Sequence, residues 1–210
     1  MRRLKYSRWS KRIERNILSV YHQATDHDMD EGLFWYQRAH DEIQLVANRH
    51  GITIKQACGV VAAISPGLSW GLNILQADKF IYAWVGGKRG KDLPMVGAYG
   101  MNAIRKALRM LEGEEPLKVF SEKTGPKTYN FYLNLIDPQS EEVTIDRHAK
   151  GAAYLVTGEK NAIVGRKEYG YLAGHYQTLA ERLGLIPNKL QAICWVTWKR
   201  IKDLKGEVPF

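Results

Sequence analysis

The sequence has few of the residues that form disulfides or bind metals. Only two of its 210 residues are cysteines, and both lie in apolar segments, Cys58 in QACGVVAAI and Cys194 in LQAICWVTW. We therefore expect two buried, reduced thiols rather than a disulfide framework. Two cysteines are also too few for a four-thiolate iron–sulfur cluster. No group of histidine, cysteine and acidic residues has metal-ligand spacing, so we expect no catalytic metal and no other cofactor.

Long apolar segments are missing as well. The sequence holds no run of about 18 apolar residues, the length that a membrane-spanning helix requires, so we expect no membrane partner. The N-terminal segment MRRLKYSRWSKR is basic but lacks the apolar core of a secretion signal, and we expect a cytoplasmic protein. The same segment fits two interpretations equally well, a solvated start to the first helix or an arm that contacts phosphates.

Positive charge is in excess. Lysine and arginine number 31 against 22 aspartate and glutamate residues, which gives a formal net charge of +9. A basic chain of this size suits a polyanion, and we expect DNA as the partner. Hydrophobic residues make up 45% of the sequence, enough for a packed core, so disorder is not expected. The oligomeric state stays open.

Helical periodicity of apolar residues runs through the chain and predicts an all-α fold. Thr53 is expected to cap a buried helix, and Asp28 and Asp146 are expected to cap two others. The loop over residues 86–97 is rich in glycine, lysine and proline and is the best candidate for a boundary between two helical lobes of one domain. Residues 116–122 are expected to form a turn, and only residues 143–145 favour an extended strand-like piece. We expect helices over residues 10–24, 28–50, 54–65, 69–85, 101–111, 127–136, 146–156, 167–183 and 188–203.

The segment from residue 123 to 154 carries the most chemical information. A turn that contains Lys123 and Gly125 leads into a helix that begins with Lys127 and presents the polar residue Asn130. The apolar piece 143–145 then delivers Asp146 to the start of the next helix, where Arg147 and His148 follow it. Lys127 and Asp146 are 19 residues apart.

Two motifs in this segment resemble the helix-hairpin-helix DNA glycosylase superfamily, and most closely its endonuclease III-like branch. In that branch a glycine-rich hairpin precedes a lysine at the start of a helix, and an aspartate follows after a loop. The matching pieces are Gly125-Pro126-Lys127-Thr128 and Ile145-Asp146-Arg147-His148. Weaker similarity upstream extends the resemblance over residues 54–157. The whole chain is also similar to a group of phage-encoded proteins, which would place it in the cytoplasm of the host cell.

The resemblance implies a fold of two helical lobes around a cleft, and a DNA glycosylase with AP lyase activity. Lys127 would attack C1′ of the damaged nucleotide and form a Schiff base, while Asp146 would stabilise positive charge on the sugar. The base would be flipped out of the helix into a pocket. Hairpin amides near Lys123 and Gly125 would hold a phosphate. The pocket would be lined by aromatic and polar side chains, for which the candidates are Trp35, Tyr36, Trp70 and Asn73.

Each candidate residue also has an ordinary structural interpretation. Lys127 is typical of a solvated lysine in a first helical turn, and Asp146 is typical of a simple N-cap. Histidines such as His148 are more often packed or exposed than functional. Tryptophans, taken singly, are more often core residues than platforms for bases, and the spacing of Trp195 and Trp198 predicts packing alone.

The hairpin and its surroundings depart from the family pattern. Pro126 has no N–H to donate to a phosphate, and Arg147 replaces a small polar residue with one suited to phosphate or pyrophosphate. Pro66 stands where the family often has a polar pocket residue. These differences favour a second hypothesis, a transferase that displaces pyrophosphate from a phosphorylated hydroxymethyl base in DNA, with Lys127 and Arg147 holding the pyrophosphate. A third hypothesis is a non-catalytic DNA-binding module.

Overall fold

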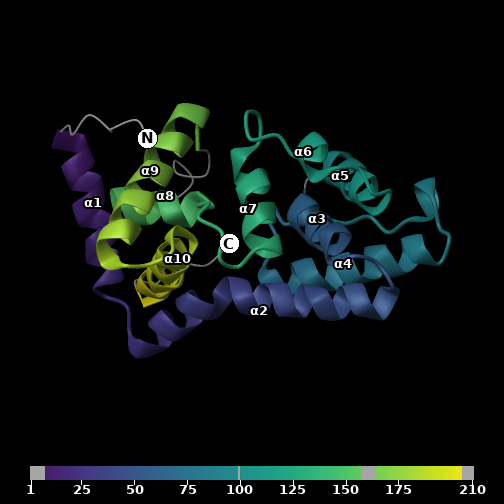
Figure 1. The fold of residues 1–210 in the computed structure, drawn as a ribbon, viewed down its shortest axis with the longest axis horizontal. Coiled ribbons are helices and arrows are strands. Elements are labelled where there is room, and N and C mark those ends of the chain that lie inside the picture. Colours follow the sequence, from purple (N-terminus) through teal and green to yellow (C-terminus); the bar gives the residue numbers. More distant parts are fainter. Residues whose placement is uncertain (1–7, 99, 158–163, 205–210) are drawn as a thin grey trace. The chain divides into compact units, whose positions relative to one another are not determined.

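The computed structural model describes residues 8–98, 100–157 and 164–204, and these residues form an all-α structure without strands (Figure 1). The all-α prediction is therefore confirmed. Residues 1–7 of the basic N-terminal segment lie outside the described residues. The elements are α1 (Arg8–Tyr21), α2 (Asp26–His50), α3 (Ile54–Ile64), α4 (Trp70–Val85), the short 3₁₀ helix η1 (Gly90–Asp92), α5 (Met101–Leu111), α6 (Pro116–Val119), α7 (Pro126–Ile136), α8 (Arg147–Tyr154), α9 (Arg166–Leu183) and α10 (Pro187–Leu204).

Local capping signals explain where several helices begin. Thr53 caps α3 as predicted, because its hydroxyl accepts a hydrogen bond from the Gln56 N–H while the Gln56 side chain accepts one from the Thr53 N–H. The prediction for α2 was wrong by one turn. Thr25 rather than Asp28 precedes the helix, and the Asp28 carboxylate accepts from the Thr25 N–H at 2.9 Å. Asp28 therefore closes a reciprocal pair with Thr25 from inside the first turn.

Two predicted irregular segments have more structure than expected. Residues 116–119 form the short helix α6 rather than a turn, because Pro116 fits the first helical position. Residues 143–145 pair with no strand in the described part of the chain. The Tyr169 hydroxyl instead donates a hydrogen bond to the Val143 carbonyl at 2.7 Å and accepts one from the Ile145 N–H at 3.1 Å. A single phenol from α9 thus fixes the chain just before Asp146.

The chain divides into two compact units, unit 1 with residues 1–36 and 138–210 and unit 2 with residues 37–137. The divisions fall within α2 and directly after α7. The loop over residues 86–97, where the sequence favours a lobe boundary, lies inside unit 2. Its glycine and proline content reflects a surface connection between α4 and α5.

Unit 2 is built around α3, which packs against α4, α5 and α7. Every residue of α3 from Ala57 to Ile64 is buried, as its apolar sequence predicts. Gly59 lets α5 approach closely, because a Cβ at this position would lie 2.4 Å from Met110 Cε. Cys58 is buried and free in this core, and burial raises the pKa of its thiol.

Unit 1 is built from α1, α8, α9 and α10, which pack together (Figure 1), and buried apolar residues of all four helices form one core. Cys194 is buried and free within it, as the sequence predicts. A polar group joins α1 to α9, since the buried Glu14 carboxylate accepts from His175 at 3.1 Å and from Arg182 at 2.8 Å. Residues of α8 are buried in this core, and Asp146 caps the N-terminus of α8.

Candidate active site around Asp146

The carboxylate of Asp146 is fixed by three N–H donors. Its Oδ1 accepts hydrogen bonds from the backbone N–H groups of His148 at 2.9 Å and Ala149 at 2.8 Å, which confirms the predicted N-cap of α8. Its Oδ2 accepts a third hydrogen bond, at 3.2 Å, from the indole N–H of Trp195 on α10. A cap needs only the first two contacts. The third bond orients the remaining oxygen and is not explained by helix capping.

Trp195 is the centre of an aromatic cluster beside Asp146. Its ring meets Trp35 edge-on, with centroids 5.9 Å apart, and His148 edge-on at 6.0 Å. Tyr36 follows, with its ring 4.8 Å from Trp35 and its hydroxyl donating to the Gln191 side chain at 3.1 Å. The cluster thus brings four predicted binding residues into the neighbourhood of Asp146, namely Trp35, Tyr36, Arg147 and His148.

Sequence reasoning missed Trp195, because the spacing of Trp195 and Trp198 predicts packing alone. That interpretation holds for Trp198, which is buried in the core of unit 1. Trp195 is only half-buried and uses its N–H to bond Asp146. The spacing of apolar residues could not reveal this role. The chemistry of the side chain could have, because a partly buried indole N–H needs a hydrogen-bond acceptor.

Several positive charges act on His148. Arg147 donates to the His148 ring nitrogen at 3.4 Å, and Lys199 and Lys202 of α10 act on the ring electrostatically. Burial lowers the pKa of His148, the Asp146 carboxylate opposes this, and the positive charges of Arg147, Lys202 and Lys199 lower the pKa further. The imidazole is therefore neutral at pH 7.

Lys127 belongs to unit 2, where it lies exposed in the first turn of α7. Within the described ranges its side chain forms no hydrogen bond and no ion pair. Pro126 occupies the first helical position, as predicted. The position and exposure of Lys127 are those of an accessible amine, and also those of an ordinary solvated lysine.

The turn before α7 differs from a phosphate-binding hairpin. The Gly125 N–H is bonded to the Ser121 carbonyl at 2.8 Å, and the Thr124 N–H to the Ser121 hydroxyl at 3.1 Å. Pro126 has no N–H, and the N–H groups of Thr124 and Gly125 are used within the turn itself, so these amides do not point to a phosphate. The exposed side chain of Lys123 remains accessible to a phosphate.

Three other predicted binding residues, Trp70, Asn73 and Asn130, also belong to unit 2. Trp70 donates its indole N–H to the Glu42 carboxylate at 2.8 Å, which ties α4 to α2. Asn73 is buried and donates to the Val61 carbonyl at 3.3 Å, which ties α4 to α3. Asn130 is buried on α7. These hydrogen bonds of Trp70 and Asn73 are typical of residues that join helices.

Comparison with protein families finds one family model that matches nearly the whole chain. The family model of DUF7178, described as a family of unknown function, matches residues 2–202. The chain belongs to the DUF7178 family. No curated protein and no solved structure matches it. The matched region includes residues of both units, and Asp146, Trp195 and Lys127 all lie within it.

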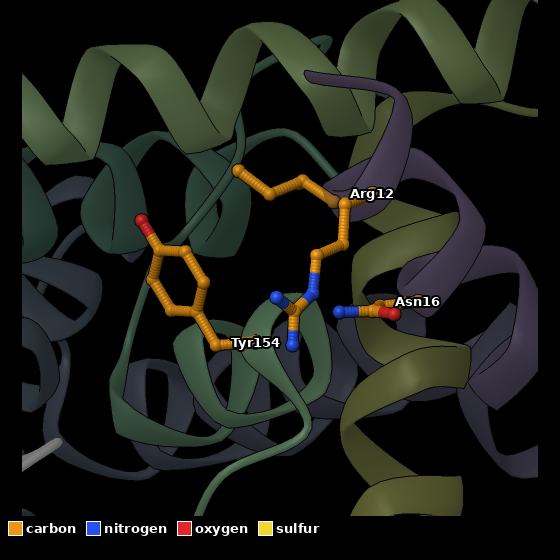
Figure 2. Close-up of a pocket in the computed structure, with 4 residues that line it drawn as sticks. Arg12, Asn16 and Tyr154 are labelled. Atoms are coloured by element: carbon orange, nitrogen blue, oxygen red, sulfur yellow. The ribbon is translucent and has the colours of Figure 1, made fainter. Parts of the chain in front are cut away.

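The DUF7178 protein also has a small cavity at the other end of α8. It measures about 250 Å³ and is lined by Arg12, Ile13, Asn16 and Tyr154 (Figure 2). The Asn16 amide donates to the Ala153 carbonyl at 3.0 Å, and burial together with Glu168 raises the pKa of Tyr154 to about 12. None of these side chains is a carboxylate or an amine, so the cavity is not the candidate catalytic centre.

Two other kinds of site are missing from the described residues. These residues contain no group of three or more histidine, cysteine, aspartate or glutamate side chains arranged to hold a metal ion. In the same part of the chain, no helix combines the length and the apolar character needed to cross a bilayer. The groups that the candidate site itself offers for chemistry are a carboxylate, an imidazole, an indole and several cationic side chains.

Proposed function

We propose that this protein is a DNA base-targeting enzyme in which Asp146 is the catalytic carboxylate. The observation that supports the proposal is the fixation of Asp146 by three N–H donors beside an aromatic and cationic cluster. Loss of a base from a nucleotide develops positive charge on the sugar. A carboxylate that is already oriented stabilises this charge without reorganising during the reaction. The net charge of +9 favours a nucleic-acid substrate.

The activity we propose in detail is that of a DNA glycosylase with AP lyase activity. The Lys127 amine would form a bond to C1′ of the flipped nucleotide as the bond from C1′ to the base breaks, and loss of a proton and ring opening would give an imine. The exposure of Lys127 in the first turn of α7 leaves its amine accessible to DNA. A fold of two helical lobes around a cleft is part of this proposal.

Borohydride trapping tests the lyase, because the reagent reduces an imine to a stable covalent adduct. The full-length protein should give a trapped adduct with DNA that contains an abasic site, and Lys127→Ala should lose it completely. Lys118→Ala is the matched control, since Lys118 is an exposed lysine of the same unit but is neither the proposed nucleophile nor a predicted binding residue. It should retain the adduct. Absence of any adduct on abasic or damaged DNA would contradict the lyase.

A second candidate is the transferase, and the positive charges around His148 favour it. An amine nitrogen would attack the methylene carbon of a pyrophosphorylated hydroxymethyluracil, the carbon–oxygen bond would break, and pyrophosphate and a proton would leave. Mass spectrometry of nucleosides from such DNA, incubated with protein and amine, should then show an aminated base. Unchanged nucleosides, together with a trapped lyase adduct, would leave the glycosylase as the better proposal.

A further inference from the structure

We propose that Arg147, Lys199 and Lys202 form a phosphate-binding site next to Asp146. This inference deepens the proposed function, because the phosphate would belong to the substrate on which Asp146 acts. The substrate group concerned is a phosphate, which neither the Thr124 and Gly125 amides before α7 nor the Asp146 carboxylate is equipped to bind.

Lys199 and Lys202 lie near the C-terminal end of α10, close in sequence to Trp195. The Lys199 ammonium lies 4.4 Å from the centroid of the Trp195 ring, whose N–H bonds Asp146. A cation over an indole face is held by the electrostatic field of the ring. Lys202 follows three residues later, so it lies on the same face of the helix. The ring of Trp195 therefore offers no open platform on the side covered by Lys199, and its neighbourhood suits an anion better than a stacked base.

Arg200, which lies between Lys199 and Lys202 in the sequence of α10, has an acidic partner within the protein. Its guanidinium donates to the Asp28 carboxylate at 2.7 Å and to the Gln23 carbonyl at 2.6 Å. Arg200 is thus neutralised by a buried acid on α2. In contrast, within residues 8–98, 100–157 and 164–204, neither Lys199 nor Lys202 forms an ion pair with a carboxylate.

The charges around His148 are unbalanced. Asp146 and Arg147 from α8, and Lys199 and Lys202 from α10, all act on its ring. Lys199 and Lys202 add two positive charges that pair with no carboxylate of the described residues, and the Asp146 carboxylate already accepts three hydrogen bonds. A phosphate would offset the excess, and a guanidinium fork with two ammonium groups matches its several oxygens. The phosphate would be either a DNA backbone phosphate or a free phosphoanion such as pyrophosphate.

The first experiment follows the His148 imidazole by NMR in the full-length protein. An anion bound among these cations should raise the apparent pKa of His148 by roughly 1 unit, the size expected from a nearby negative charge. The titration is run with pyrophosphate, with a short single-stranded oligonucleotide, and with chloride at matched ionic strength. A shift with the oligonucleotide indicates a backbone phosphate, and a shift with pyrophosphate alone indicates a free phosphoanion.

The second experiment measures oligonucleotide affinity against salt for Lys199→Gln/Lys202→Gln. The double variant should bind about tenfold more weakly, and its salt slope should fall by about 1 for each phosphate that a lysine no longer neutralises. Lys189→Gln, at the other end of α10, is the control and should bind like the unmodified protein. An unmoved His148 with both ligands, or equal affinity for the double and control variants, would overturn the phosphate site. Neither readout needs turnover, so failure of the lyase or transferase assay leaves this test intact.

Discussion

Replacing Asp146 by asparagine should lower the rate of base excision or base modification by roughly 100- to 10,000-fold. The substitution removes the negative charge that we propose to stabilise the transition state. Asparagine caps helices as well as aspartate does, so the hydrogen bonds to His148 and Ala149 should persist. Its amide N–H would, however, face the indole N–H of Trp195, and the loss of that bond costs about 1 kcal/mol. Activity should therefore fall far more than stability, which single-turnover rates and urea unfolding measure together.

Trp195→Phe is the matched control for this effect. It removes the N–H that donates to Asp146 Oδ2 but keeps an aromatic ring beside Trp35. The carboxylate retains its charge and its cap, so we expect only about a tenfold loss of activity, equivalent to one hydrogen bond. Full activity in Asp146→Asn would reduce Asp146 to a simple cap and would contradict its proposed catalytic role.

The sequence predicts most helices because their start and stop signals are local. Thr53 and Gln56 are three residues apart, and Asp146 caps a helix whose N–H groups are two and three residues away. The partner of the second Asp146 oxygen lies 49 residues away on α10, and no local pattern contains that information. The use of the hairpin amides by Ser121 was also hidden, because it depends on the exact path of one turn.

The division into two units was hidden from the sequence for a different reason. Composition marks the loop at 86–97, because glycine and proline interrupt helices there. The actual divisions fall within the continuous helix α2 and directly after α7. A helix that continues from one packing environment into the next carries no breaking residue. Only the packing of the folded chain assigns residues up to 36 to unit 1 and those from 37 onward to unit 2.

Gly32→Ala should destabilise unit 1 by about 2 kcal/mol or more, at the upper end of what overpacking costs. Gly32 lies in α2, where alanine would ordinarily favour the helix by up to about 1 kcal/mol. A Cβ at this position would, however, lie 2.4 Å from the Cα and 2.6 Å from the backbone nitrogen of Ile193 on α10. Backbone atoms cannot rotate away as a flexible side chain can, so α10 itself must shift. Urea unfolding measures the loss of stability.

Gly71→Ala is the control for Gly32→Ala in the same unfolding assay, because it should not lower the free energy of unfolding. Gly71 lies near the start of α4, and a Cβ there would meet no atom within 4 Å. The substitution should be neutral or stabilising by up to about 1 kcal/mol, because only the helix preference changes. If Gly32→Ala matched Gly71→Ala, α2 and α10 would not be in backbone contact. Because α10 also carries Trp195 and Lys199, the shift in Gly32→Ala should weaken activity at Asp146 while Gly71→Ala leaves it unchanged.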